Sequence, residues 1–286
     1  MRFVCLLLLA AATICPAQDR KLRIIAIGAH PDDCDIKVAG TAYKLAQAGH
    51  AVKFVSVTNG DAGHHEIGGG MLAKRRYLET QESARRLGIA EYEVLDNHDG
   101  ELTPNLDVRR QLIRSIRRWR ADIVVGPRPN DYHPDHRYTG VLVQDAAYMV
   151  VVPNVTPDVP PLENNPIFLY YRDNFQKPAP FRPDVVVSLD DVLDKKVNAL
   201  DAHTSQFYEW LPWVDHRLHE VPKDLGERKK WLTGTWVQQV SDAERATLER
   251  RYGAQRAKAI KYSESFELCE YGQQPSLAEL DRIFPR

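Results

Sequence analysis

Short apolar runs alternate along the chain with segments whose apolar residues recur at helical spacing. Strands are expected at the apolar runs, which occupy residues 24–28, 51–58, 92–95, 123–126, 167–171 and 184–188. Helices are expected where apolar residues recur three or four positions apart, over 38–46, 73–87, 107–118, 142–149 and 193–200. This alternation of strand and helix predicts an α/β fold with a mostly parallel sheet and helices on both faces.

Longer connections interrupt this order. Residues 59–70 are rich in glycine and include His64 and His65, so a mobile loop is expected there at the functional edge of the sheet. The proline-rich stretch 152–166 is too long for a simple connection and is expected to form a lid or rim. A capping box at Ser241 predicts a last long helix that reaches about residue 261.

The stretch from Phe207 to Trp236 contains Trp210, Trp213, Trp231 and Trp236. These indoles could form a sugar-stacking surface, but aromatic residues in a long covering segment more often pack on the core.

The first residues have the pattern of a signal peptide. A short positive start precedes an apolar run from Phe3 to Ile14, and small residues follow before Gln18. Residues 1–17 are therefore expected to be a signal peptide, and residues 18–286 a single domain that is exported to the periplasm or secreted. The apolar run is short for a membrane span, and no later stretch approaches the ~20 apolar residues that a span needs.

Composition narrows the class of partner. The chain has 286 residues, 43% of them hydrophobic, which is enough for a substantial core. Its 38 basic and 39 acidic side chains leave a formal net charge of −1, so nothing indicates a nucleic-acid partner. After removal of the signal peptide the cysteines are Cys34 and Cys269, and no disulfide is expected between them because Cys34 lies beside candidate metal ligands.

Two clusters carry the candidate chemistry. His30-Pro31-Asp32-Asp33 follows the strand at 24–28, and Asp131-Tyr132-His133-Pro134-Asp135-His136 follows the run at 123–126. Because the carboxyl ends of parallel strands face one crevice, the clusters are expected to form a joint site. A dinucleotide is not indicated, since Gly28-Ala29-His30 lacks the glycine fingerprint that pyrophosphate binding requires.

The residue types in these clusters fit a catalytic metal. Zinc in a hydrolase takes about three nitrogen or carboxylate ligands and keeps an open position, and His30, Asp33 and His136 supply such a set. Asp32 is expected to act as general base, and His133 to assist the oxyanion or the leaving amine. Asp135 is expected to hold the His133 ring by accepting its other proton.

Further motifs accompany the two clusters along the chain. These are Gly40-Thr41, Thr58-Asn59-Gly60-Asp61, Arg76 with Glu79, Asp99-Gly100, His203-Thr204-Ser205-Gln206 and Ser263-Glu264-Ser265-Phe266-Glu267. Together with the paired His-Pro-Asp motifs, the set resembles the PIG-L (LmbE-like) family of zinc-dependent N-acetylglucosaminyl deacetylases.

The resemblance implies a Rossmann-like fold and removal of an acetyl group from an N-acetylglucosamine-type sugar. It assigns the ligands to His30, Asp33 and His136, for Zn²⁺ or another divalent ion such as Fe²⁺. It also implies substrate binding by Arg76, with Asp61 and Asp99 as further candidates.

One position departs from the family pattern. The family usually has glutamate after the two aspartates, where this chain has Cys34 followed by Asp35. Packing is the favoured role for this thiol over an extra metal ligand, since free cysteine commonly behaves as a small buried apolar residue. Two other functions stay open: an amidase for a larger acyl or thiol conjugate, and a non-catalytic carbohydrate-binding protein.

Overall fold

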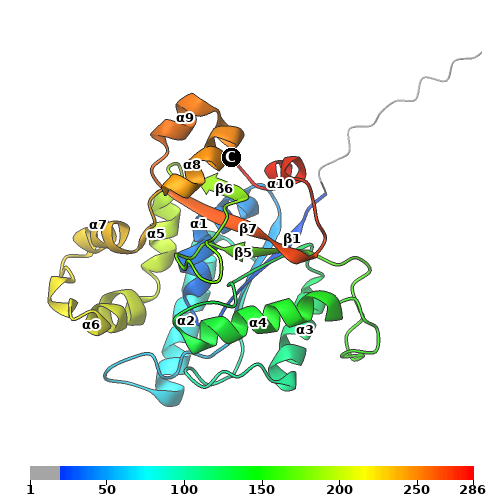
Figure 1. Cartoon of the computed structure of the whole chain (residues 1–286). Helices are drawn as coiled ribbons and strands as arrows, with labels where there is room; N and C mark the ends of the chain where they lie inside the picture. The colour runs from blue at the N-terminus through cyan, green and yellow to red at the C-terminus, as the bar shows by residue number, and fades with distance from the viewer. Residues whose placement is uncertain (1–19) are drawn as a thin grey trace, which may run out of the picture.

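A seven-stranded sheet forms the centre of the computed structural model, which describes residues 20–286 (Figure 1). Its strands lie in the order β3-β2-β1-β4-β5-β7-β6. They are β1 (Arg23–Gly28), β2 (Ala51–Ser56), β3 (Glu91–Val94), β4 (Ile123–Gly126), β5 (Ile167–Tyr171), β6 (Val185–Ser188) and β7 (Ser263–Gly272). The expected signal peptide lies outside the described residues and stays a prediction.

Strand direction confirms the mostly parallel α/β fold. Strands β1 to β5 pair in parallel, whereas β7 runs antiparallel to both β5 and β6. The sequence pattern did not predict β7 as a strand. Among the described residues, no helix combines the length and apolar content that a bilayer span requires.

Helices cover both faces of the sheet because alternate residues of β1 are buried on opposite sides. Ile24 and Ala26 pack in one core with α1 (Asp33–Gln47), α2 (Gly69–Leu87), α5 (Leu193–Leu200) and α10 (Leu277–Ile283). Ile25 and Ile27 pack in a second core with α3 (Leu106–Trp119) and α4 (Pro134–Met149). Full burial of each isoleucine contributes about 1.5–3 kcal/mol to stability.

The sheet order places a crevice between β1 and β4. From β1 the chain continues into α1 on one face, and from β4 into α4 on the other face. Such a change of side is where ligands bind in open parallel sheets. Both His-Pro-Asp clusters begin at this point, directly after β1 and a few residues after β4.

The predicted single helix after Ser241 is wrong. The structure has α8 (Asp242–Tyr252) and α9 (Ala254–Ala259), separated at Gly253. Gly253 has φ of 78°, a conformation that glycine adopts without steric cost and that ends the first helix. The capping box at Ser241 is present as predicted.

The expected lid at residues 152–166 is also wrong. The buried guanidinium of Arg117 donates hydrogen bonds to main-chain carbonyls of residues 149–159 and so holds the loop against α3. None of these loop residues lines the large cavity described below. Figure 1 shows the loop on the opposite side of the molecule from α6 and α7.

A different segment, residues 206–238, covers the crevice. This cover segment contains η1 (Gln206–Trp210), α6 (Leu211–Val214), η2 (Leu218–Glu220) and α7 (Leu225–Trp236). It packs on α5 through a small apolar core that includes Val197, Phe207 and Leu232. Gln206 Nε2 donates to the Gly63 carbonyl at 3.1 Å, which joins the cover segment to the 59–70 loop.

Candidate active site

A cavity of about 700 Å³ lies at the carboxyl ends of β1 and β4. The sequence-predicted residues that line it are His30, Asp32, Asp33, Arg76, Asp99, His133 and His136. The cavity is also lined by residue 171, by residues 173–175 and by the cover segment. The joint site expected from the two clusters is therefore present in the fold.

The turn after β1 is organised by the Asp33 carboxylate. Asp33 Oδ2 accepts hydrogen bonds from the backbone N–H groups of Ala29 and His30, at 2.8 and 2.9 Å. A Cβ atom at Gly28 would lie 2.5 Å from Asp33 Cβ, so this position has no room for a side chain. The glycine thus allows Asp33 to approach the end of the strand.

The turn after β4 is organised as a helix N-terminus. His133 is the N-cap of α4, and its Nδ1 accepts the backbone N–H of Asp135 at 3.2 Å. Pro134 occupies the first helical position, where no donor is needed. Because Nδ1 of His133 accepts this bond, a neutral His133 carries its proton on Nε2.

The predicted ligand atoms meet at one point. His30 Nδ1 lies 3.1 Å from His136 Nε2. Asp33 Oδ2 lies 3.6 Å from His30 Nδ1, and Asp33 Oδ1 lies 3.5 Å from His136 Nε2. Ligands about 2.1 Å from a tetrahedral ion stand roughly 3.4 Å from one another. The three side chains therefore converge on one position that is suited to a cation.

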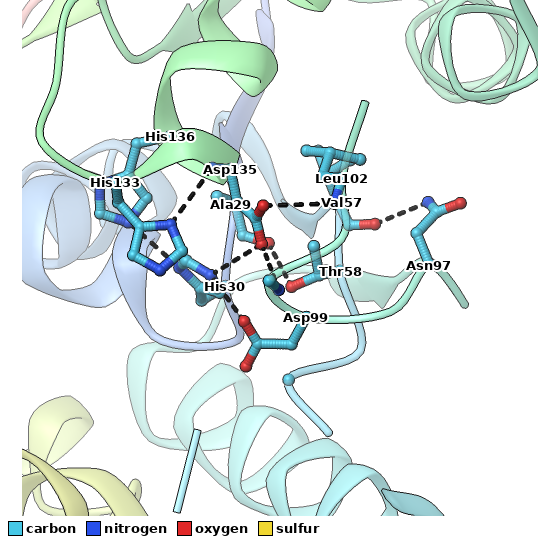
Figure 2. A network of polar contacts seen from close by, with 12 residues as sticks. Ala29, His30, Val57, Thr58, Asn97, Asp99, Leu102, His133, Asp135 and His136 are labelled. Carbon is cyan, nitrogen blue, oxygen red and sulfur yellow. Dashed lines mark hydrogen bonds and ion pairs between the residues drawn. The ribbon is translucent and has the colours of Figure 1, made fainter. Parts of the chain in front are cut away.

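The remaining nitrogen of each histidine faces a carboxylate. His30 Nε2 lies 3.1 Å from Asp99 Oδ1 and 3.4 Å from Asp135 Oδ2, as Figure 2 shows. His136 Nδ1 lies 3.1 Å from Asp131 Oδ1. Such carboxylates fix the tautomer of a metal-binding imidazole and increase its basicity. The sequence did not predict this role of Asp131, although the residue is the first of the second cluster, Asp131 to His136.

Among the described residues, the groups whose potential ligand atoms all lie within 4.8 Å of one another are His30 with His133 and His136, and His30 with Asp99 and Asp135. A cation between Asp99 and Asp135 would stand near Arg76, whose guanidinium is 3.5 Å from Asp99 Oδ2. It would also compete with the Gly100 N–H that the Asp135 carboxylate accepts. In the first group, His133 Nδ1 accepts the Asp135 N–H, so the neutral ring carries its proton on Nε2 and has no lone pair there for a metal. In the set His30, Asp33 and His136, Oδ2 of Asp33 accepts the N–H groups of Ala29 and His30, so Oδ1 is the candidate ligand atom of this carboxylate.

The charges around the ligands favour a cation. Burial opposes protonation of His30, but the adjacent carboxylates of Asp135, Asp33 and Asp99 raise its pKa. Burial likewise opposes ionisation of Asp33, yet His136 and His30 hold the pKa of this carboxyl well below its usual range. The Asp33 carboxyl is therefore ionised, and its surroundings stabilise positive charge beside it.

Asp32 is buried beside the ligands and contacts Arg76. The guanidinium Nη2 of Arg76 donates to Asp32 Oδ1 at 3.3 Å. Burial raises the pKa of Asp32, and Arg76 opposes this shift. The adjacent Arg75 instead pairs with Glu209 at 2.6 Å, so Arg76 is the one of these two arginines that lines the cavity.

Two predicted contacts are corrected by the structure. The Asp135 carboxylate does not accept a proton from the His133 ring, because it accepts the N–H groups of Gly100 and Leu102 and faces His30 instead. Asp61 does not line the cavity. Its carboxylate accepts the Asp99 N–H and pairs with His98, so Asp61 shapes the loop that carries Asp99.

Cys34 has the predicted packing role. Its side chain is buried in the core, where Sγ donates to the Ala26 carbonyl at 3.4 Å. Cys34 and Cys269 are both free, as expected. The acid next in sequence, Asp35, is fully buried, contacts Ser83 and lies 3.0 Å from His203 Nε2.

Comparison with known proteins identifies the family. The PIG-L model, described as GlcNAc-PI de-N-acetylase, matches residues 25–147. A diacetylchitobiose deacetylase from Thermococcus kodakarensis is 33% identical over 210 residues, which cover 69% of this chain and 75% of the relative. The chain belongs to the PIG-L (LmbE-like) family. The 25–147 match includes both His-Pro-Asp clusters.

Solved structures agree with this assignment. An N,N'-diacetylchitobiose deacetylase from Pyrococcus horikoshii superposes with a TM-score of 0.64 and 27% identity, over 86% of this chain and 83% of that chain. GalB, a 4-carboxy-2-hydroxymuconate hydratase from Pseudomonas putida KT2440, superposes with a TM-score of 0.63 and 19% identity, over 90% of this chain and 99% of that chain. Because GalB is named as a hydratase, this fold alone does not identify a reaction, and the function has to be inferred from the side chains of the site.

Proposed function

We propose that this protein is a metal-dependent hydrolase that removes the N-acetyl group from an N-acetylglucosamine-type sugar. The observation that carries the proposal is the meeting of His30, Asp33 and His136 at one point of a cavity that also contains Asp32 and His133. Support comes from the relatives, since the T. kodakarensis and P. horikoshii proteins are named as deacetylases of diacetylchitobiose.

The side chains divide the work of amide hydrolysis. When bound, a divalent cation supplies Lewis acidity, which acidifies a nearby water and polarises a carbonyl. Asp32 accepts the proton of the attacking water, and its contact with Arg76 fixes the orientation of the carboxylate. His133 presents its Nε2–H to the developing oxyanion or to the leaving amine, because Nδ1 is held by the helix N-terminus.

We propose zinc as the ion. Two imidazoles and one carboxylate with an open position form the usual set of a catalytic zinc site. The same set accommodates ferrous iron, which is the second candidate. Metal analysis of the purified protein, followed by anaerobic reconstitution with Zn²⁺ or Fe²⁺, distinguishes the two.

Acetate release is the direct test of the activity. Incubation with N-acetylglucosamine and with N,N'-diacetylchitobiose is expected to produce acetate and free amine in equal amounts. Chelation is expected to abolish the release, and a divalent ion to restore it, because the water then regains its acidity. Acetate release at full rate after complete removal of metal would contradict the proposal.

The same assay separates the alternative functions. An amidase for larger conjugates would prefer a bulky acyl group to acetyl on the same sugar. A carbohydrate-binding protein would bind the sugar in calorimetry and release no acetate with any metal. We expect acetyl to be preferred and turnover to be observed.

A further inference from the structure

Four aromatic rings form a column that ends at the cavity. His64 stacks on His65 with centroids 4.7 Å apart, His65 stacks on Trp213 at 5.1 Å, and Trp213 stacks on Trp210 at 5.4 Å. The angles between successive rings are 15°, 7° and 16°. Trp210 is the last ring of this column and lines the cavity.

The column is fixed before any ligand binds. Glu209, next to Trp210, lies 2.9 Å from His64 Nε2 and accepts two hydrogen bonds from Arg75, at 2.6 and 2.8 Å. Gln206 holds the Gly63 carbonyl of the same loop. Trp213 covers one face of the Trp210 indole, which therefore has a defined orientation. A wall fixed in this way binds a flat ligand at little cost in conformational entropy.

Trp236 also lines the cavity, but its surroundings differ from those of Trp210. It packs edge-on against Phe207, with centroids 5.5 Å apart and planes at 67°. Its Nε1 is buried without a hydrogen-bond partner. Trp236 thus belongs to the packing of the cover segment, whereas Trp210 ends an aromatic column at the cavity.

The cavity is larger than one sugar requires. Its volume of about 700 Å³ lies in the range that holds drug-sized ligands, and a single acetamido sugar is smaller than these. Asp32, Arg76 and His133 belong to the end near the ligand histidines, where the acetamide reacts. The cover segment adds Trp210 and Gln238, an aromatic ring and an amide that suits hydroxyl groups.

We propose that Trp210 is the stacking platform for a second pyranose ring, the ring joined through a glycosidic bond to the sugar whose acetamide is hydrolysed. The inference rests on the proposed function and adds a residue that determines specificity. The apolar C–H face of a pyranose packs on the flat indole, while its hydroxyl edge stays available to amides and water. The substrate is then a disaccharide or longer amino-sugar oligosaccharide.

A pair of variants tests the platform. Trp210→Leu retains apolar bulk without a flat ring, whereas Trp210→Phe retains a ring. We expect Trp210→Leu to raise KM for N,N'-diacetylchitobiose about tenfold with little change in kcat, and kcat/KM for N-acetylglucosamine to stay within about twofold. Trp210→Phe is expected to keep most of the preference for the disaccharide. Trp231→Leu, in the same segment but outside the cavity lining, is the matched control.

Each result of the comparison is decisive. Equal losses on monosaccharide and disaccharide would overturn the platform, because they indicate a general structural role, and so would unchanged disaccharide kinetics in Trp210→Leu. A loss confined to an aryl N-acetylglucosaminide would also overturn it, because the ring on Trp210 would then be aromatic. Calorimetry of the metal-free protein with the disaccharide, expected to weaken in Trp210→Leu, provides a reading without turnover. Failure of the proposed function differs from all of these, since the parent protein would release no acetate.

Discussion

Replacement of Asp32 by asparagine is expected to lower kcat for acetate release by about 10²–10⁴-fold. The amide has the shape of the carboxylate and can still accept the hydrogen bond from Arg76 Nη2, so the local structure is retained. It cannot accept the proton of the attacking water. KM and metal content are therefore expected to change little, which places the loss in the chemical step.

Steady-state kinetics and metal analysis of the purified Asp32→Asn variant provide the check. Asp107→Asn is a suitable control, because Asp107 is exposed on α3 and its carboxylate pairs with Arg110 at the surface. A variant that keeps more than a tenth of the parent kcat would show that Asp32 is not the base. Loss of the metal from Asp32→Asn would instead assign Asp32 to metal binding.

Replacement of His136 by alanine is expected to abolish both metal binding and activity. The change removes one of the three converging atoms, and the remaining pair, His30 and Asp33, leaves the ion with too few protein ligands. Loss of a carboxylate that only orients a ligand typically costs 10–100-fold in metal affinity, so loss of the ligand itself is expected to cost more. The activity is expected to fall to the background of the assay.

Thermal unfolding gives a reading of this variant that does not depend on turnover. An ion that binds only the folded state raises the melting temperature of the parent as its concentration increases. We expect Zn²⁺ to raise the melting temperature of the parent and of the control His219→Ala, whose side chain is exposed on η2, but not that of His136→Ala. An equal rise in His136→Ala would place the ion elsewhere.

The parts of the site that could be predicted from the sequence are those whose pattern lies within a few consecutive residues. A buried apolar run followed by His-Pro-Asp predicts a strand and the turn after it, and β1 and β4 were found in this way. The N-cap role of His133 was not predicted, because the helix expected after the second cluster covered only residues 142–149. Parallel pairing then brings the two turns together, because the carboxyl ends of β1 and β4 are adjacent in the sheet. The likeness of the spaced motifs to one family supplied the chemistry.

The parts that sequence did not predict depend on contacts between distant segments. The Asp135 carboxylate accepts the Gly100 N–H and not the predicted proton of the His133 ring. No local sequence pattern distinguishes these two donors. The lid predicted at 152–166 is held elsewhere by Arg117, an arginine that the sequence places on a helix among other arginines. The stacking of Trp213 on His65 likewise requires the fold, since 148 positions separate them in the chain (213 minus 65).

Anomalous diffraction at the zinc edge from zinc-saturated crystals tests most directly whether the two clusters share one cation. The account predicts a single peak about 2.0–2.2 Å from His30 Nδ1, His136 Nε2 and an Asp33 carboxylate oxygen. A peak at His30 Nε2 between Asp99 and Asp135, or no peak near His30, would contradict it.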